Sequence, residues 1–253
     1  MRALPLVLVL AACSSSASPP PATDASITDA VTATDAVTAA DVVTAADVVT
    51  VADVVTAADA PAGAFTAVAL RSDAPVRAFT EPEMVLVAGQ DYRAVMETDV
   101  GRIVLDLYED RTPLAVNSFV FLALHRYFDG LAFHRVLEGF VAQGGDPLTA
   151  MEPRTRWGTG GPGYNFDTET FNDLTFGAAG TLGMARSQSR ASNGSQFFIT
   201  LAATANLNGQ YTVFGRVTEG LDVLPRIARN ATMTAPPMVP TRMTTVRIES
   251  RAR

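Results

Sequence analysis

Apolar and polar residues alternate between positions 93 and 108, around a turn that contains Gly101. Alternation with a period of two is typical of β-strands, so this stretch predicts a β-hairpin. The following segment, 113–124, is apolar at nearly every position, and it begins with Pro113 directly after Thr112. A proline at the first helical position after a hydroxyl residue favours a helix start, so we expect one buried helix there.

Short strand-like runs separated by glycine and asparagine follow this helix. They cover residues 133–136, 140–143, 181–186, 196–200, 212–217 and 244–248. A second short helix is expected over 221–229, although Pro225 would strain it outside the first turn. Many short strands with one or two helices predict a closed β-barrel or a β-sandwich.

The chain begins with an apolar run that is too short to cross a membrane as a helix. Residues 1–12 read as a signal peptide, and "LAAC" ends at Cys13, the only cysteine. The segment resembles a bacterial lipoprotein signal, which implies cleavage before Cys13, acylation of its thiol and a lipid anchor. By the same resemblance, Ser14 favours the outer membrane, facing the periplasm. The alternative is an ordinary cleaved signal with an incidental cysteine.

A repeated segment separates this signal from the rest of the chain. Between residues 14 and 60 there is no basic residue, glycine or aromatic residue, and an aspartate recurs every six positions from Asp29 to Asp59. Six fits neither a helical stripe nor a heptad, and large core-forming side chains are missing. We predict a solvated low-complexity tether, with a small hexapeptide β-solenoid as the alternative.

The tether accounts for most of the acidic net charge of −7. From Arg71 onward the chain has 18 basic and 19 acidic residues, which gives a net charge of −1. A nearly neutral domain lacks the basic surface that nucleic-acid binding requires, so we expect no nucleic-acid partner.

The sequence gives little support to nucleotide binding or to a metal site. Gly158, Gly160 and Gly163 match G-x-G-x-x-G, but no buried strand precedes them and no apolar helix follows, so we predict a surface loop. His125 and His134 are the only histidines and lack zinc-site spacing, so we predict neither metal nor cofactor. Composition alone leaves a Ser-His-Asp site open. We expect structural roles for both histidines, with His134 hydrogen-bonded inside the barrel.

Two segments, "FHRVLEGFVAQGGD" and "NGSQFFIT", mix polar side chains with phenylalanines. Neighbours in a strand alternate between faces, so Gln196 and Phe198 share one face, and Phe140 and Gln143 can share a face with Arg135. Buried arginine and glutamine side chains need hydrogen-bond partners, so ordinary core strands rarely contain them. This combination indicates a functional site.

These two segments and two others resemble the cyclophilin family of peptidyl-prolyl cis-trans isomerases. The segments "FHRVLEGFVAQGGDP", "GTGGPGY", "GSQFFI" and "LNGQYTVFGRV" occur in that family's order and spacing. The resemblance covers about residues 84–248. It implies a mainly β fold, a closed eight-stranded antiparallel β-barrel capped by two α-helices, with a peptide groove on its outer face.

The resemblance also implies roles for single residues. Arg135 matches the catalytic arginine, and Gln143 and Gln196 match the catalytic groove amides. The expected substrate-binding residues are Phe140, Val141, Ala185, Phe198, Leu207 and Tyr211. Asn206 stands where some members have a tryptophan. An extra stretch, 148–157, precedes the glycine-rich loop, and we expect its Trp157 to be a packing residue.

These observations divide the chain into a signal peptide at 1–12, a lipidated cysteine and tether at 13–83, and an isomerase domain at 84–253. We expect a monomeric, lipid-anchored enzyme of the bacterial cell envelope that rotates X-Pro bonds in proline-containing polypeptides. Two alternatives stay open at this stage. One is a scaffolding module that binds proline peptides without useful catalysis, and the other is a display or adhesion lipoprotein whose tether is the functional part.

Overall fold

The computed structural model describes residues 63–171, 173–230, 232 and 235–253. The predicted signal peptide, Cys13 and the hexapeptide repeats lie outside the described residues. No helix in the described ranges is both long and apolar enough to cross a membrane.

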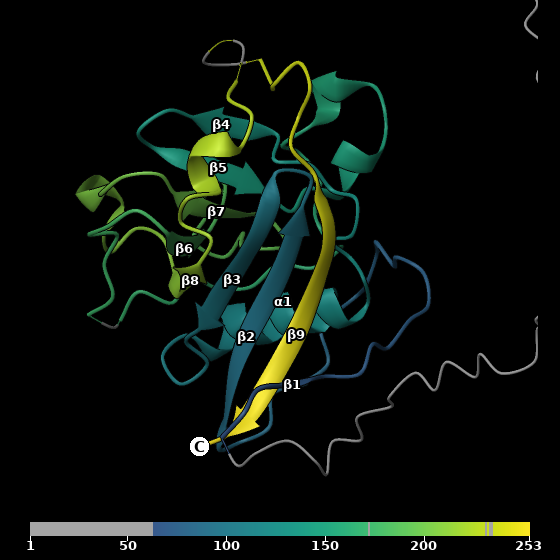
Figure 1. Cartoon of the computed structure of the whole chain (residues 1–253), viewed down its shortest axis with the longest axis vertical. Coiled ribbons are helices and arrows are strands. Elements are labelled where there is room, and N and C mark those ends of the chain that lie inside the picture. Colours follow the sequence, from purple (N-terminus) through teal and green to yellow (C-terminus); the bar gives the residue numbers. More distant parts are fainter. Residues whose placement is uncertain (1–62, 172, 231, 233–234) are drawn as a thin grey trace, which may run out of the picture. The chain divides into compact units, whose positions relative to one another are not determined.

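One antiparallel sheet forms most of the domain (Figure 1). Its nine strands follow the order β1-β9-β2-β3-β8-β6-β7-β5-β4. Their bounds are β1 Thr66–Ala67, β2 Gln90–Thr98, β3 Gly101–Leu107, β4 Arg135–Leu137, β5 Val141–Gly144, β6 Thr181–Met184, β7 Phe197–Thr200, β8 Val213–Glu219 and β9 Met243–Ala252. The α-helix α1 spans Pro113–Leu124, and four 3₁₀ turns occupy Pro147–Ala150 (η1), Arg154–Arg156 (η2), Ala205–Leu207 (η3) and Leu224–Arg226 (η4).

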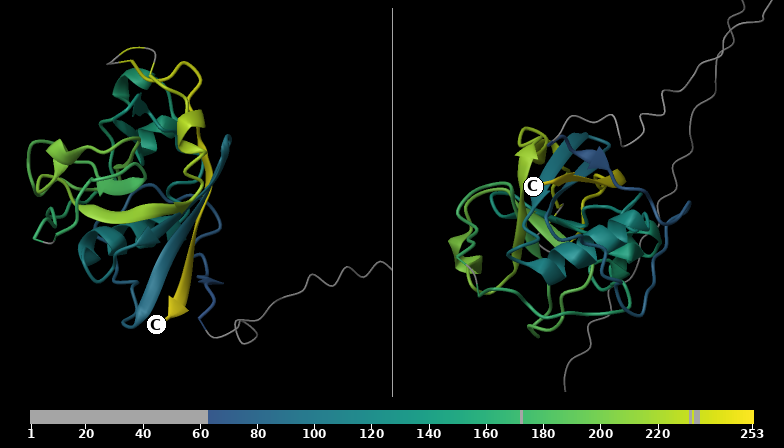
Figure 2. Two further views of the ribbon diagram at one scale, coloured as in Figure 1. Left: turned by 60° about the vertical axis from the view of Figure 1, so that its left-hand side comes forward. Right: turned by 90° about the horizontal axis from the view of Figure 1, so that it is seen from below.

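The predicted hairpin and helix are both present. β2 and β3 pair in register around the turn at residues 99–100, and α1 begins at Pro113 as expected. Thr112 makes no side-chain cap, however. The Glu169 carboxylate instead accepts hydrogen bonds from the Leu114 and Ala115 amides, at 3.1 and 2.9 Å. Figures 1 and 2 show the helix on one side of β2, β3 and β9.

The sheet differs from the predicted closed eight-stranded barrel, because its pairing does not close among the described residues. The two edges are β1 and β4. The segment before β4 meets the start of β9 through one isolated bridge, Ala132 to Arg242, and through backbone hydrogen bonds between residues 130–133 and 241–243. β4 has just three residues, and β1 adds a ninth strand beyond β9. These contacts between the two ends of the sheet involve only a few residues and do not form a strand pair, so the sheet stays open.

The second predicted helix, over 221–229, is also wrong. Only Leu224–Arg226 form a helical turn, of the 3₁₀ type, and Ile227 is already extended. Pro225 has no amide hydrogen to donate to the carbonyl of residue 221, so an α-helix over 221–229 would lose that hydrogen bond, and the chain forms only a 3₁₀ turn with Pro225 in its first positions. Val223 and Ile227 are both buried, and the extended chain lets each reach the core.

Packing begins well before residue 84, the predicted start of the domain. β1 pairs with β9, and the Val68 amide donates to the Ile248 carbonyl at 2.8 Å. The Phe65 ring lies 4.3 Å from the Arg93 guanidinium and 4.6 Å from that of Arg251. The folded part of the chain therefore includes residues from about Thr66 onward, earlier than the predicted boundary at 84, and this segment lies along the outer edge of β9.

The buried side chains form two clusters. The large core surrounds Phe197, which has no exposed surface and contacts the rings of Phe119, Phe128 and Phe133 edge-on. The smaller cluster lies on the opposite face of β7, around Phe198. Because neighbours in a strand point to opposite faces, Phe197 packs in the large core and Phe198 packs in the smaller cluster. The smaller cluster supplies the apolar part of the candidate site.

Candidate functional site

Arg135 stands on β4, the edge strand at the end of the sheet opposite β1. Its neighbour Val136 is buried at 1% exposure, so alternation turns the half-buried Arg135 side chain away from the core. In the β4–β5 pairing Arg135 lies directly opposite Gln143. The Arg135 Nη1 donates to Gln143 Oε1 at 3.4 Å, and the guanidinium carbon lies 5.9 Å from the centre of the Phe140 ring. The arginine is thereby held beside an apolar surface.

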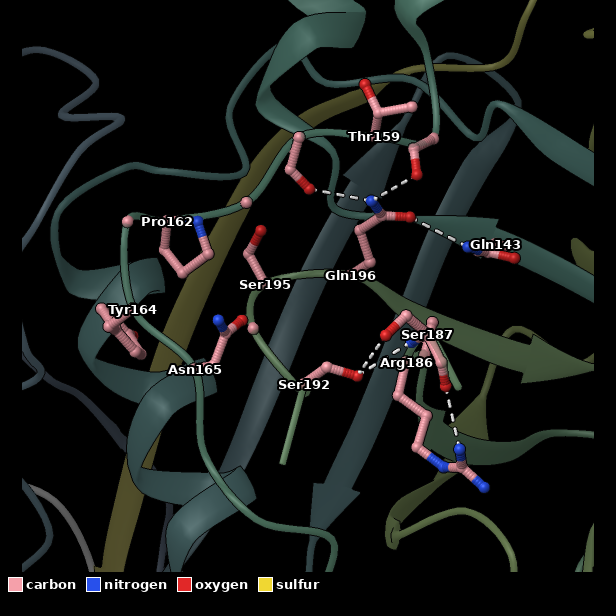
Figure 3. Close-up of a pocket in the computed structure, with 16 residues that line it drawn as sticks. Gln143, Thr159, Pro162, Tyr164, Asn165, Arg186, Ser187, Ser192, Ser195 and Gln196 are labelled. Atoms are coloured by element: carbon pink, nitrogen blue, oxygen red, sulfur yellow. Dashed lines mark hydrogen bonds between the residues drawn. The ribbon is translucent and has the colours of Figure 1, made fainter. Parts of the chain in front are cut away.

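The two glutamines continue this series of hydrogen bonds (Figure 3). Gln143 Nε2 donates to Gln196 Oε1 at 2.9 Å. Gln196 Nε2 in turn donates to the carbonyls of Gly158 at 3.1 Å and Gly160 at 2.9 Å. Each glutamine therefore donates from its amide nitrogen and accepts at its amide oxygen, which fixes the orientation of both amides. The Gln143 oxygen is left facing Arg135.

The glycine-rich loop has a role that the sequence prediction missed. It is a loop, as expected, but its Gly158 and Gly160 carbonyls hold Gln196 in place. A Cβ atom on Gly160 would lie 2.2 Å from the Asp146 Oδ1, so this close approach requires glycine. Backbone carbonyls carry no side-chain signal, and only the repeated glycines indicated that the loop packs tightly against something.

The six predicted substrate-binding residues all belong to the smaller apolar cluster. Val141, Phe198 and Leu207 are buried, while Phe140, Ala185 and Tyr211 are partly buried against them. Phe176 and Val213, which the sequence analysis did not single out, complete the buried part. The cluster borders Arg135 through Phe140, so an apolar surface and the arginine side chain lie side by side.

Phe198 is the central ring of this cluster. Its centre lies 5.4 Å from that of Phe176 and 5.8 Å from that of Tyr211. A Cβ atom on Gly183 would lie 2.5 Å from Phe198 Cζ, so only glycine on β6 admits this ring position. Asn206, the residue that departs from the family pattern, is exposed in η3 beside the buried Leu207.

A cavity of about 670 Å³ adjoins Gln196 (Figure 3). The glycine-rich loop forms one wall, and residues 185–187 with 192–196 form the other. Tyr164 also lines it. The Tyr164 hydroxyl lies 2.8 Å from the Ser118 Oγ, and burial raises the pKa of Tyr164 to about 12. The phenol is consequently neutral near pH 7, and the cavity has a polar, uncharged character on that side.

His134 is 6% exposed, and neither ring nitrogen has a partner with good hydrogen-bond geometry among the described residues. Burial lowers the pKa of His134 and Arg135 lowers it further, whereas the Asp146 carboxylate, the Ala132 backbone and the Gln196 side chain raise it. The lowered pKa leaves His134 neutral near pH 7, and its hydrogen bond inside the fold stays a prediction. His125 is structural, because its Nδ1 lies 2.8 Å from the Phe121 carbonyl at the end of α1.

Trp157 was expected to be a packing residue rather than a site residue. It is instead half-buried, and it lines a second cavity beside Arg135. Its Nε1 donates to the Met151 carbonyl at 3.0 Å. No group of three or more histidine, cysteine, aspartate or glutamate side chains within the described ranges is arranged to hold a metal ion.

This arrangement offers a cationic hydrogen-bond donor beside an apolar slot. Arginine has five N–H donors and no acceptor, so Arg135 can donate a hydrogen bond but cannot act as a nucleophile. Chemistry that stabilises a polar atom without breaking a covalent bond fits these residues best.

Comparison with known proteins agrees with the geometry. Residues 93–248 match the family model described as "Cyclophilin type peptidyl-prolyl cis-trans isomerase/CLD". The chain is 44% identical over 132 residues to the peptidyl-prolyl cis-trans isomerase ppi1 of Schizosaccharomyces pombe, a match that spans 52% of this chain and 82% of the relative. It is 41% identical over 136 residues to a peptidyl-prolyl cis-trans isomerase of Helicobacter pylori, spanning 53% of this chain and 78% of the relative.

Solved structures give the same result. A crystal structure of a cyclophilin-type isomerase from Cryptosporidium parvum, in the presence of the dipeptide Ala-Pro, aligns with a TM-score of 0.56 and 30% identity. The alignment covers 62% of this chain and 98% of that one. The similarity extends over almost the whole of the parasite protein.

Proposed function

This chain belongs to the cyclophilin-type peptidyl-prolyl cis-trans isomerases, and on that premise we propose that Arg135 is its catalytic cation and exported polypeptides are its substrates. Enzymes of this class rotate the peptide bond that precedes a proline. The observation that carries the role of Arg135 is the series of hydrogen bonds that runs from its guanidinium through Gln143 to Gln196, beside the apolar slot.

The reaction needs no nucleophile, because no covalent bond breaks. Amide resonance creates a barrier of about 18–20 kcal/mol, and the uncatalysed bond exchanges over about 10–100 s. In the twisted transition state the prolyl nitrogen regains its lone pair. A donor placed at that nitrogen binds it more strongly than in the planar ground state, which is the condition for catalysis. Arg135 supplies this donor, and Gln143 orients it.

One hydrogen bond is not enough for rapid turnover. A charge-assisted hydrogen bond contributes about 1.5–3 kcal/mol, or one to two decades of rate. Turnover at about 10²–10³ per second requires a reduction of about 5–7 kcal/mol in the barrier. We assign the remainder to positioning of the peptide, with the proline ring against Phe140, Phe198 and Leu207. Gln196 holds the peptide backbone, while Val141, Ala185 and Tyr211 complete the slot.

Exchange spectroscopy tests the isomerase activity directly. A peptide with one Ala-Pro bond gives separate NMR signals for its cis and trans forms. Catalytic amounts of the full chain should produce exchange cross-peaks between these signals on a subsecond timescale, whereas the free peptide shows none. Peptide signals that broaden through binding, without exchange between the two isomers, would support a scaffolding module instead.

We further propose that the enzyme is anchored by lipid at Cys13 in the bacterial envelope. The supporting observations are the apolar leader at 1–12, the single cysteine that follows it and the repetitive segment up to about residue 60. As a flexible coil, fifty residues span about 40 Å root mean square, enough to hold the domain clear of the lipid headgroups. In Figure 1 the described chain begins near β1, whereas β4 and β5 lie at the other end of the domain.

Mass spectrometry of the mature protein tests the anchor. We expect an acylated cysteine at its N-terminus and recovery in the membrane fraction, and Cys13→Ser should release the protein or block its maturation. An unmodified N-terminus with a soluble mature chain would establish the ordinary cleaved signal.

A further inference from the structure

A second cavity, of about 620 Å³, adjoins the one drawn in Figure 3. Arg135, Gln143, Trp157 and Gly158 are among its lining residues, and Gln143 and Gly158 line both cavities. When a peptide lies across Arg135 with its proline in the apolar slot, the residues before the proline can therefore lie toward one cavity and the residues after it toward the other.

The first wall of this cavity comes from the insertion at 148–157, whose two ends are fixed. Asp146 has no exposed surface, and its carboxylate accepts hydrogen bonds from the Leu148 amide, at 2.8 Å, and from the Gly158 amide. The Arg154 guanidinium carbon lies 5.1 Å from the Trp157 ring centre. Trp157 therefore lies beside Arg135 in a loop that the Asp146 hydrogen bonds and the Arg154 contact hold in place.

The second wall comes from a distant proline-rich segment, 235–238. Arg154 Nη1 joins the two walls, because it donates to the Met238 carbonyl at 2.8 Å and to the Pro237 carbonyl at 3.3 Å. Pro236 lines the cavity, and Met238 has 80% of its surface exposed. Met151, on the insertion, is 56% exposed. The two segments that form the walls therefore also carry large apolar side chains that are open to solvent outside the cavity lining.

The charged side chains that line the cavity, Arg135 and Arg154, are both basic. None of the described lining residues carries an acidic side chain. The Glu152 carboxylate pairs with Arg154 Nε at 3.2 Å, but 70% of that carboxylate side chain is exposed outside the lining. A lysine or arginine side chain that enters the cavity would meet two guanidinium groups and no acidic side chain among the lining residues.

We propose that this cavity is a second subsite of the peptide groove and that it receives a large apolar side chain on one flank of the isomerised proline. The inference rests on the proposed function, because the cavity shares Arg135, Gln143 and Gly158 with the site. Trp157 and Pro236 supply the apolar contact, and the two arginines reject basic side chains. The subsite is a specificity determinant that the insertion adds to the common groove.

Matched peptides test this subsite. Peptides with an all-alanine flank serve as reference, and leucine or arginine is placed at each of the two positions on either side of the proline. In the wild-type chain, leucine should exceed arginine in kcat/KM by about tenfold, the lower end of the discrimination that apolar pockets achieve. The preference should be confined to one flank and should appear mainly in KM, because the contact is shared by ground and transition states.

The variants separate this subsite from a structural role of the insertion. Trp157→Ala should reduce the ratio of leucine to arginine kcat/KM to within about twofold, whereas Trp157→Phe, which keeps an aromatic wall, should retain it. Phe171→Ala, a loss of a ring that is 99% exposed and lines neither cavity, is the matched control with an unchanged ratio.

The possible failures are distinguishable. Wild-type turnover of the reference peptide decides the proposed function by itself. The subsite is overturned if that turnover is present but leucine and arginine are used equally, if both flanks respond alike, or if Trp157→Ala leaves the ratio unchanged.

Discussion

Replacing Gln196 by alanine should weaken both the fold around the site and the turnover of proline peptides. The substitution removes three hydrogen bonds, one accepted from Gln143 at 2.9 Å and two donated to the glycine-rich loop at 3.1 and 2.9 Å. A typical hydrogen bond contributes about 0.5–1.5 kcal/mol net. Water can replace some of them at this partly exposed site, so we expect a loss of about 2 kcal/mol in unfolding free energy.

That loss corresponds to a fall of about 4–8 °C in Tm for a domain of this size. Turnover should decrease about tenfold, because Gln143 loses the partner that fixes its amide and so orients Arg135 less well. Gln90→Ala is the matched control, since Gln90 is a half-buried glutamine at the start of β2, away from the site.

A double-mutant cycle makes the test specific. Gln143→Ala and Gln196→Ala should be non-additive in log kcat/KM, with a coupling energy above about 0.5 kcal/mol, because either change interrupts the same series of hydrogen bonds. The measurements are kcat/KM on a proline tetrapeptide and thermal unfolding for both single variants, the double variant and the control. Additive effects within about 0.3 kcal/mol would refute the reasoning that the two amides act as one unit.

Three further predictions concern the slot and its surroundings. Phe198→Leu should raise KM for a proline peptide severalfold with a smaller change in kcat, because the 4%-exposed ring forms the centre of the slot; an unaltered peptide affinity by titration calorimetry counts against this assignment. Gly183→Ala should destabilise the domain by about 1–3 kcal/mol, since its Cβ would lie 2.5 Å from Phe198, and a denaturation midpoint equal to that of wild type contradicts the packing. The pKa of His134 is lower in the folded chain than in the unfolded chain, so the unfolded chain binds more protons between the ordinary pKa of about 6.5 and the lower folded value. The unfolding free energy should therefore decrease as the pH is lowered through that window, by up to about 1.4 kcal/mol per pH unit. Urea unfolding from pH 7 to pH 5 measures this slope, and His134→Gln should reduce it; equal slopes for both chains oppose the buried neutral histidine.

The elements with a local signal were predictable from the sequence. Alternation around Gly101 marks the β2–β3 hairpin, and Pro113 after Thr112 marks the start of α1, because turns and first helical turns depend on neighbouring residues. The closure of the sheet depends instead on segments about 110 residues apart, such as Ala132 and Arg242. Their single bridge has no counterpart in the residue pattern, and the barrel prediction therefore failed.

The candidate site shows the same division. Strand alternation placed Arg135 and Gln143 together, and the resemblance to the family identified the apolar residues that cluster around Phe198. The partners of Gln196 are backbone carbonyls, which no side-chain pattern reveals. Trp157 reaches the cavity beside Arg135 only because Asp146 fixes both ends of the insertion.

The role of Arg135 is the claim on which the account depends most. The most direct measurement is kcat/KM for Arg135→Ala in a protease-coupled assay on a proline tetrapeptide, alongside circular dichroism to show that the fold is retained. We predict a loss of at least one to two decades, the value of one charge-assisted hydrogen bond of about 1.5–3 kcal/mol. A folded Arg135→Ala chain that turns over the peptide at the wild-type rate would contradict the account.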